Sequence, residues 1–464
     1  MVTATTRHDV VVIGAGCAGL AAAVGLARHG ARVLVLEARG KLGGRATSFV
    51  DRATGELVDN GQHVLLGCYH ETLRWLDALG AGDRVERAAS LDASFVDAAG
   101  QWSHLHCPPL PSPWHLVAGV LRWRGLSLRD RLSVFRLARV LLSARGRAPH
   151  EAAAMAPADQ TVAQWLAAHG QGEQLQAMLW EPLALAALNQ DIRVASASAF
   201  LPVLAGVFGP DPADAAVVLP RVPLDEMYAE PARAEIERLG GEVRANALAH
   251  VVFDGERLAG IDVRGERVAA PQVVVATGWF SLPSVLRDAG PAVADLVRRA
   301  SATAASPIVT VNLWFDRPVL DEPFVGLPGR RMQWVFDKQR IFGGGRASHL
   351  SLVSSGAQDI LRASNDAVVS LALDEVVGAL PAARRARLER AVVVREPNAT
   401  FSLAPGQPER PGVRTSVEGL YLASDWVDTG LPATLESAVV AGRLAALAAL
   451  ADAGINVSGP LFGP

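Results

Sequence analysis

The sequence predicts an α/β protein in which a nucleotide-binding domain is assembled from separated stretches of chain, with an α+β domain inserted between them. Three observations support this prediction. A strand, a glycine-rich turn, a helix and a second strand ending in an acid follow one another near the N-terminus. A second strand-to-helix element lies near the C-terminus. The long stretches between these elements carry both helical and strand patterns, as an inserted α+β domain should.

The composition is that of a large globular protein. With 464 residues, half of them hydrophobic and a fifth charged, the chain can bury an extensive core. The net charge of −3, with both signs spread along the chain, gives no reason to expect a nucleic-acid partner. Three cysteines without a CxxC pair or a zinc-like spacing indicate a reducing compartment and predict no metal site. Without a signal-peptide pattern or an apolar run of about 20 residues, we expect a cytoplasmic protein.

The first segment contains a strand–turn–helix–strand unit. A β-branched strand at 9–13 leads into a glycine-rich turn and a helix, and a second strand at 32–36 ends at Glu37. The glycines of this turn are Gly14, Gly16 and Gly19. They let the backbone turn tightly and approach a pyrophosphate at the helix N-terminus. Glu37 lies where an acid accepts hydrogen bonds from a ribose hydroxyl, so the unit predicts a Rossmann-type dinucleotide site and disfavours NADP.

The residues after the second strand indicate which dinucleotide is bound. The sequence Glu37-Ala-Arg-Gly-Lys-Leu-Gly43-Gly44-Arg45 resembles the FAD-binding signature of the amine oxidase/phytoene desaturase superfamily. This resemblance implies FAD as the cofactor. It also implies that Gly43 and Gly44 let the chain pass the FAD phosphates and ribityl chain, and that Arg45 adds positive charge beside them.

Residues 419–438 resemble the C-terminal motif of the same superfamily, in which a strand ending in an acid is followed by a loop and a helix. The resemblance implies that Asp425 bonds the ribityl or phosphate region. We expect a helix over 434–450, with Pro432 in its first turn. Its N-terminus would direct a partial positive charge toward the N1/O2 edge of the flavin, and Leu435 is among the residues expected to bind the cofactor.

The stretch DNGQHVLLGCY at 59–69 places a polar cluster before an apolar run. We expect 57–66 to be the strand that runs beside the isoalloxazine ring in this superfamily. Gly61 would permit close approach of the backbone, and Gln62 and His63 would face the flavin or the substrate. A satisfied structural histidine is an equally good interpretation of His63.

The superfamily resemblance also implies how the domains are divided. We expect the FAD-binding domain in residues 1–90, 216–290 and 416–464, and one substrate domain in residues 91–215 and 291–415. The middle FAD segment predicts a helix at 224–239, a small antiparallel meander turning at Asp254-Gly255 and a returning strand at 273–276. By resemblance, the main chain near Leu248 would contact the adenine.

The predicted substrate domain contains both helical and strand patterns. Residues 161–206 are mostly helical in pattern and open with a capping box, whereas 308–315 and 349–353 predict strands. Residues 110–147 form a basic amphipathic stretch, with eight arginines against the single acid Asp130. Because this stretch also carries two tryptophans, we favour contact with a membrane surface over a solvated helical face. Such contact would suit a substrate that resides in the bilayer.

Three internal stretches narrow the resemblance. DNGQHVLLGCY, LWEPLALAALN at 179–189 and SPIVTVNLWFDRPV at 306–319 are similar to the hydroxysqualene dehydroxylase family of hopanoid synthesis. The resemblance implies conversion of hydroxysqualene to squalene and water by reduced flavin. The candidates for the acid that assists departure of the hydroxyl are His63 and Glu181, although solvation at a helix end is the commoner role for Glu181. Pro182 should break or kink the helix at Glu181. Trp180, Trp314 and Phe315 would line the site of an allylic cation, although packing in the protein core is the commoner role for such residues.

Other functions remain open at this point. The cofactor motifs fit oxidative desaturation of a carotenoid precursor equally well. An amine or porphyrinogen oxidase is a further alternative, although no paired tyrosine cage accompanies Trp426. A prenyl-binding protein related to Rab GDP-dissociation inhibitors would do no flavin chemistry and has no need of the FAD motifs. No second dinucleotide unit is evident, so we expect an external electron donor of unknown identity.

Overall fold

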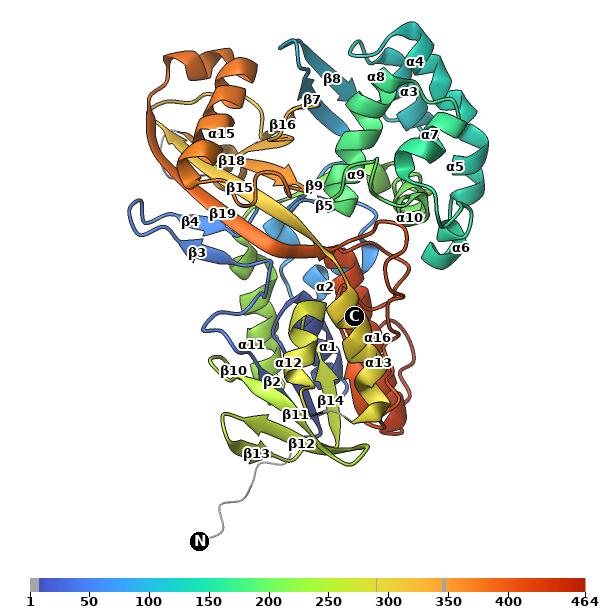
Figure 1. Cartoon of the computed structure of the whole chain (residues 1–464), viewed down its shortest axis with the longest axis vertical. Helices are drawn as coiled ribbons and strands as arrows, with labels where there is room; N and C mark the ends of the chain where they lie inside the picture. Colours follow the sequence, from blue (N-terminus) through green and yellow to red (C-terminus); the bar gives the residue numbers. More distant parts are fainter. Residues whose placement is uncertain (1–7, 289, 344–347, 464) are drawn as a thin grey trace.

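The computed structural model describes residues 8–288, 290–343 and 348–463. Figure 1 shows two tiers, with a parallel sheet in the lower part and a mixed sheet beside a group of helices in the upper part. The parallel sheet has the strand order β10-β2-β1-β14-β20. Its strands are β1 (Val10–Ile13), β2 (Val33–Leu36), β10 (Glu242–Arg244), β14 (Gln272–Val275) and β20 (Leu420–Leu422).

Three separated stretches of chain supply these strands, and every pairing in the sheet is parallel. Helices pack on one face: α1 (Cys17–Arg28), α2 (His70–Ala78), α11 (Glu230–Arg238) and α16 (Leu435–Asp452). Helices α1 and α16 approach closely because small residues face each other; a Cβ at Gly442 would come within 2.3 Å of the Ala18 carbonyl oxygen. The sheet confirms the predicted α/β fold.

The other face of the parallel sheet is covered by the predicted meander and two further helices. The meander consists of β11 (Ala249–Asp254), β12 (Arg257–Val263) and β13 (Glu266–Val268), and the helices are α12 (Leu282–Val285) and α13 (Pro291–Ala302). Val293, Leu296 and Ala300 of α13 share one hydrophobic cluster with this sheet. The predicted domain boundary at residue 291 therefore precedes a helix that packs with the first domain; the division itself stays a prediction.

The upper tier contains a seven-stranded sheet of order β19-β15-β18-β17-β16-β7-β8. Its strands are β7 (Asp92–Val96), β8 (Trp102–His106), β15 (Ala305–Phe315), β16 (Phe324–Gly326), β17 (Trp334–Asp337), β18 (Ser348–Ser355) and β19 (Leu388–Phe401). The predicted strands at 308–315 and 349–353 lie within β15 and β18. Helix α15 (Asn365–Ala379) shares a hydrophobic cluster with these strands, and the short α14 (Lys338–Phe342) follows β17.

A group of helices lies beside the seven-stranded sheet (Figure 1). It contains α3 (Trp114–Arg122), α4 (Leu128–Ser133), α5 (Ala138–Ala144), α6 (Pro149–Ala153), α7 (Val162–Ala168), α8 (Glu173–Leu175), α9 (Glu181–Leu188) and α10 (Ala197–Val207). The predicted capping box is present, with Thr161 and Gln164 bonding each other's backbone amides. No helix within the described ranges is long and apolar enough to cross a membrane.

The structure revises two predictions about the local backbone. A π-helical turn at Gln176–Trp180 runs directly into α9, so the helix is not broken at Pro182; the wider turn before it accommodates a residue without an amide hydrogen. Residues 57–66 are not one strand. Instead, β4 (Leu57–Asp59) and β5 (Leu65–Leu66) are separated by a loop, because Gly61 has a φ of +98° and its amide turns back to the Asp59 carbonyl at 2.7 Å.

The remaining strands connect the two tiers. β3 (Ser48–Val50) pairs with β4, and β9 (Val217–Pro220) pairs with both β5 and β6 (Val85–Arg87). These short strands hold the loop 60–64 between the parallel sheet and the seven-stranded sheet.

Candidate active site

One cavity of about 830 Å³ extends from the predicted nucleotide turn to the helical group. Its wall at one end includes the glycine motifs and the start of α16. Its wall at the other end consists mainly of apolar and aromatic side chains from the seven-stranded sheet and from α3, α5 and α9. The loop 60–64 contributes to the wall as well. A dinucleotide site and an apolar chamber are thus continuous.

The two glycine motifs lie against each other at the nucleotide end. The amide of Gly43 donates to the Ala15 carbonyl at 2.8 Å, and Gly16 pairs with Gly43 as an isolated bridge. A Cβ at Gly19 would come within 2.0 Å of the Gly14 carbonyl oxygen, so packing within the protein itself requires glycine there. A Cβ at Gly16 would meet no protein atom closer than 3.9 Å and would instead project into free space. Gly16 therefore leaves room for a ligand.

Glu37 directly follows β2 and is buried at the nucleotide turn. Its carboxylate accepts hydrogen bonds from the Ala15 and Arg39 amides, both at 2.9 Å. A carboxylate has about four lone-pair positions, so it retains capacity for a ribose hydroxyl. Glu37 both fixes the turn and faces the cavity.

Arg45 and Asp425 form an ion pair although 380 residues separate them in sequence. Arg45 Nη1 also donates to the Ala399 carbonyl at 2.8 Å, and its guanidinium lies 5.5 Å from the ring centroid of Trp279. Arg45 and Asp425 both line the cavity, which confirms that the N- and C-terminal motifs meet at one place. Asp425 neutralises Arg45, and the ion pair links the N-terminal motif to the C-terminal motif.

Helix α16 begins at Leu435, with Thr434 as its N-cap accepting from the Ser437 amide at 3.1 Å. The prediction that Pro432 lies in the first turn is wrong, because the Thr434 cap fixes the start of the helix two residues later. Leu435 and Thr434 line the cavity, so the N-terminus of α16 faces it. Leu248, which follows β10, also lines the nucleotide end and is half exposed.

The nucleotide end fits FAD on two structural observations. Gly16 leaves a space that any side chain would fill. The hydroxyl of Thr277 lines the same region, is fully buried, and lacks a hydrogen-bond partner within the described part of the chain. Buried hydroxyls are normally satisfied, so Thr277 points to a polar ligand group. Gly14, Gly43 and Gly44 complete a backbone surface at this end that carries no obstructing side chains.

His63 lines the cavity from the loop 60–64. Its Nδ1 donates to the Gly61 carbonyl at 3.0 Å. Burial lowers the pKa of His63 below its ordinary value, and Lys338 and Arg45 lower it further, against opposing contributions from the Gly61 hydrogen bond and Asp59. A neutral imidazole that carries its proton on Nδ1 has a bare Nε2. His63 is therefore a hydrogen-bond acceptor or a base in the isolated protein, whereas the sequence proposed it as an acid.

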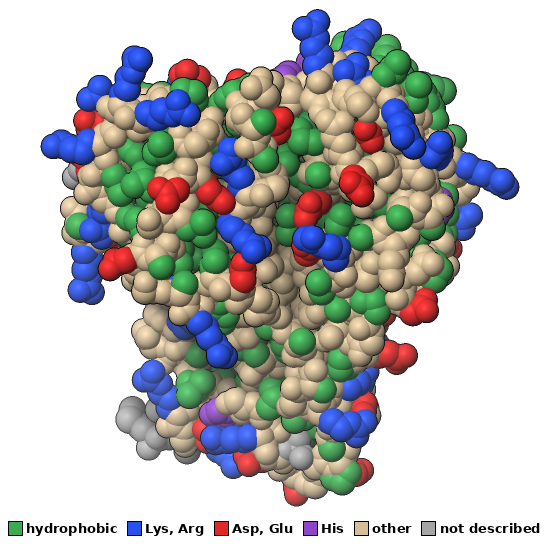
Figure 2. Space-filling model, turned by 45° about the horizontal axis from the view of Figure 1, so that its top comes forward, with side chains coloured by type: hydrophobic (Ala, Val, Ile, Leu, Met, Phe, Trp, Pro, Cys, Tyr) green, Lys and Arg blue, Asp and Glu red, His purple; other side chains and the backbone are tan. Residues whose placement is uncertain are grey.

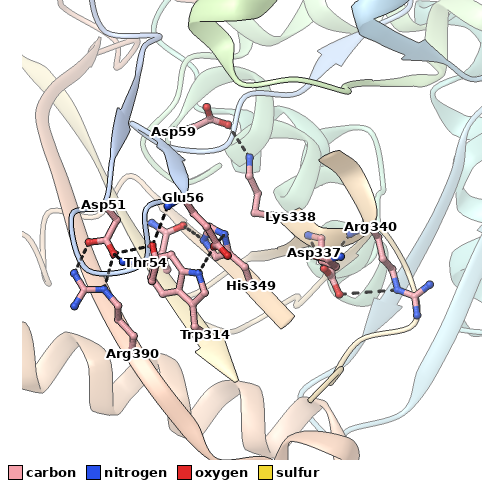
Figure 3. A network of polar contacts seen from close by, with 12 residues as sticks. Asp51, Thr54, Glu56, Asp59, Trp314, Asp337, Lys338, Arg340, His349 and Arg390 are labelled. Carbon is pink, nitrogen blue, oxygen red and sulfur yellow. Dashed lines mark hydrogen bonds and ion pairs between the residues drawn. The ribbon is translucent and has the colours of Figure 1, made fainter. Parts of the chain in front are cut away.

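A buried ion pair that the sequence did not predict fixes this loop. Lys338 Nζ donates to Asp59 Oδ2 and to Gln62 Oε1, both at 2.6 Å, and Figure 3 shows Lys338, the first residue of α14, reaching toward Asp59. Asp59 Oδ1 accepts from the Ser48 hydroxyl at 2.7 Å. Gln62 donates in turn to the His63 carbonyl at 3.0 Å. The charge of Lys338 thus holds the backbone that presents His63.

The structure separates the other proposed catalytic residues. Trp180 lines the cavity, but Glu181 is not part of the described cavity wall; its carboxylate lies 3.8 Å from the Arg193 guanidinium. The carboxyl group that reaches the cavity beside the loop is Glu396 of β19, which accepts from Asn60 Nδ2 at 3.2 Å. Sequence reasoning missed Glu396, because nothing distinguishes it from the other charged residues of a long half-buried strand.

Trp314 and Phe315 also lie outside the described cavity wall. Trp314 is fully buried, donates to Glu56 at 2.5 Å and stacks on His349 with ring centroids 4.1 Å apart (Figure 3). These contacts fasten the β3–β4 hairpin to the seven-stranded sheet, and the expectation that Trp314 and Phe315 line a cation site is wrong. The aromatic residues that do line the apolar chamber are Phe95, Trp114, Phe135, Trp180, Phe208, Phe324, Trp334 and Phe336.

A separate cluster of potential metal ligands lies away from the cavity. Asp92, His104 and His106 project from the β7–β8 hairpin, and all three are exposed. Asp92 bonds His104 at 2.8 Å and His106 at 2.7 Å. These mutual contacts account for the cluster, so it adds nothing to the site.

Comparison with known proteins agrees with this geometry. A family model described as flavin containing amine oxidoreductase matches residues 17–450. The chain is similar to a hydroxysqualene dehydroxylase of Sinorhizobium fredii, with 29% identity over 96% of this chain and 99% of that protein. It is also similar to a 15-cis-phytoene desaturase of Synechococcus elongatus, with 25% identity over 95% of this chain and 96% of that one.

Solved structures share the fold at lower identity. Cyclohexylamine oxidase from Brevibacterium oxydans superposes with a TM-score of 0.70 at 18% identity, covering 97% of this chain and 100% of that one. An oxidoreductase from Methanosarcina mazei gives a TM-score of 0.72 at 16% identity, covering 93% and 98%. The family match spans nearly the whole chain, so the protein belongs to the flavin-containing amine oxidoreductases and is an FAD-dependent oxidoreductase.

Proposed function

We propose that the protein reduces hydroxysqualene to squalene. The observation that carries this proposal is the continuity of the cavity, which joins the nucleotide turn to a long chamber lined by apolar and aromatic side chains. Such a chamber suits a flexible isoprenoid and offers few groups to a polar substrate. The similarity to hydroxysqualene dehydroxylases over nearly the full chain supports the same choice.

The net reaction exchanges an allylic C–O bond for a C–H bond and releases water. Bound FAD in its reduced form would supply the hydride, and the single proton needed to release water would reach the leaving oxygen through the carboxyl group assigned below. The apolar wall keeps water away from the developing allylic cation, and the faces of Trp180 and Trp334 attract its positive charge. Excluding water prevents the cation from recapturing a hydroxyl group.

We assign the handling of the substrate hydroxyl to two side chains at the loop 60–64. The bare Nε2 of neutral His63 accepts a hydrogen bond from the hydroxyl and orients it. Glu396 is the carboxyl group in the cavity wall beside this loop, held by Asn60, and we assign to it the proton transfer at the leaving oxygen. Glu181 has no part in this proposal, because it lies outside the described cavity wall.

One observation favours a second function, oxidative desaturation of a carotenoid precursor. Desaturation requires a base to take up a proton after hydride removal, and neutral His63 with a bare Nε2 has the character of a base. The similarity to phytoene desaturases at 25–26% identity supports this alternative.

A crossed assay tests the two functions. The purified flavoprotein is incubated in reduced and in oxidised form with either hydroxysqualene or phytoene, and the lipids are identified by mass spectrometry. We expect squalene only from the reduced protein with hydroxysqualene. A desaturated product from the oxidised protein with phytoene, without squalene formation, would favour the second function.

A further inference from the structure

We propose that the surface formed by α3, α4 and α5, here called the basic apolar face, docks on an anionic lipid bilayer and opens the cavity toward it. The face is defined by Trp114, Leu128, Leu132, Phe135 and Leu142 together with the arginines of residues 122–147. This inference deepens the proposed function by assigning the source of the lipophilic substrate. The exposure of these apolar side chains and the charge of the arginines support it, and vesicle binding tests it without a measurement of turnover.

The apolar side chains of this face are unusually exposed. Leu128 is 69% exposed, Trp114 61% and Leu142 55%. Soluble surfaces carry scattered exposed apolar residues, but this concentration within three consecutive helices is what marks an interaction site. Leu128 and Leu132 lie one helical turn apart on α4, Phe135 lies in the 3-10 turn Val134–Arg136 that joins α4 to α5, and Leu142 lies on α5. All four are exposed, and we call them the stripe.

The arginines around this stripe have no carboxylate partner in the described part of the chain, although Arg131, Arg136, Arg145 and Arg147 donate to backbone carbonyls. The eight arginines between residues 122 and 147 form no ion pair within 4.0 Å with any described residue, whereas arginines elsewhere, such as Arg390 and Arg414, pair with aspartates. Six of the eight are exposed: Arg122, Arg124, Arg129, Arg136, Arg139 and Arg147. Figure 2 shows blue basic side chains next to green hydrophobic ones at the upper right of the molecule, over these helices. Unpaired cations beside exposed apolar groups complement anionic headgroups above acyl chains.

The face also contains one opening of the cavity. Trp114, Phe135 and Leu142 line the apolar chamber and are exposed as well. The nucleotide end reaches the surface separately, at Leu248 and Phe280, which are likewise both lining and exposed. An isoprenoid can therefore pass between a bilayer and the chamber without crossing water or the cofactor end.

Co-sedimentation of the FAD-loaded protein with vesicles tests the proposal. We expect binding to vesicles of phosphatidylglycerol and phosphatidylcholine at low salt, weaker binding at high salt, and little binding to pure phosphatidylcholine. The double variant Leu128→Gln/Leu132→Gln alters the stripe without touching the cavity wall, and we expect its partitioning to fall by about tenfold or more. Arg129→Gln/Arg139→Gln should reduce binding by roughly tenfold at low salt.

Matched controls replace exposed residues outside the face. Val194→Gln/Ile455→Gln and Arg267→Gln/Arg362→Gln should bind vesicles as the unaltered protein does. Equal binding by all variants, or no binding to the anionic vesicles, would overturn the proposal. Sedimentation velocity tests whether the face instead binds a second copy of this chain. That assignment would follow if the unaltered protein is a dimer that does not bind vesicles and Leu128→Gln/Leu132→Gln is a monomer.

Activity measurements keep this inference separate from the proposed function. With substrate supplied in detergent micelles, we expect Leu128→Gln/Leu132→Gln to convert hydroxysqualene as the unaltered protein does, and with substrate in anionic vesicles to be slower. If neither protein converts hydroxysqualene in micelles, the proposed reaction fails while the vesicle-binding result still stands.

Discussion

Lys338 and Asp59 form an ion pair that is almost completely shielded from solvent, with side chains 4% and 3% exposed and 2.6 Å between Nζ and Oδ2. The pair connects the start of α14, directly after β17 of the seven-stranded sheet, to the β3–β4 hairpin that precedes the loop 60–64. Burial lowers the pKa of Lys338 below its ordinary value, and the charge and hydrogen bond of Asp59 oppose that shift. Such a pair fixes geometry more than it adds net stability.

The substitution Lys338→Met should be strongly destabilising. It leaves the Asp59 carboxylate buried without its cation, which typically costs about 3–5 kcal/mol. The double variant Lys338→Met/Asp59→Asn should recover much of this loss, because the asparagine oxygen can still accept from Ser48. Denaturant unfolding measures both. A double variant no more stable than Lys338→Met alone would show that charge burial is not the cause.

Stability should fall on acidification through the titration of His349. Burial lowers the pKa of His349 to about 3, against an unfolded value near 6.5. The unfolded chain therefore binds the proton first as the pH falls below about 6.5, and between pH 7 and pH 5 the folded state loses about 2 kcal/mol. The lowered pKa of His63 acts in the same direction.

The variant His349→Gln tests this assignment. It should show a shallower decline in unfolding free energy between pH 7 and pH 5 than the unaltered protein. An unchanged slope in His349→Gln would contradict the assignment.

The first glycine motif offers a matched pair of substitutions. Gly16→Ala meets no protein atom within 3.9 Å, so the cofactor-free protein should keep its stability while FAD content falls. Gly19→Ala would place a methyl group 2.0 Å from the Gly14 carbonyl oxygen and should destabilise the cofactor-free protein as well. Flavin absorbance per protein and thermal unfolding of both forms separate the two effects. Normal FAD content in Gly16→Ala would refute the role assigned to Gly16.

Glu396 and Glu181 provide the corresponding test for proton transfer. We expect Glu396→Gln to lower the rate of squalene formation by about 10²–10⁴-fold at unchanged FAD content. Glu181→Gln should retain the rate, because the described cavity wall does not include Glu181. The opposite result, with Glu181→Gln inactive and Glu396→Gln active, would restore the candidate suggested by the sequence.

The parts of the fold that local patterns determine could be predicted from the sequence. The strand at Val10–Ile13 and the glycine turn after it obey short-range rules of burial and backbone freedom, and the structure places them as expected. The prediction of one continuous strand over 57–66 failed because the positive φ of Gly61 breaks the strand. The sequence alone does not show which conformation a single glycine adopts.

The rest of the site depends on contacts between distant residues. Lys338 and Asp59 are 279 positions apart, and Asn60 and Glu396 are 336 apart, so no local pattern relates them. Trp314 shows the same limit for a residue that was assigned to the site. An aromatic residue in an apolar strand fits a substrate pocket as well as it fits the protein core, and only its hydrogen bond to Glu56 identifies Trp314 as a contact between the two tiers.

The most direct test of the central claim is an anaerobic single turnover. The purified flavoprotein is photoreduced, hydroxysqualene is added, and the flavin spectrum is followed while the lipid is extracted for mass analysis. We predict flavin reoxidation with one squalene formed per flavin. A flavin that stays reduced, with hydroxysqualene recovered unchanged, would contradict the account.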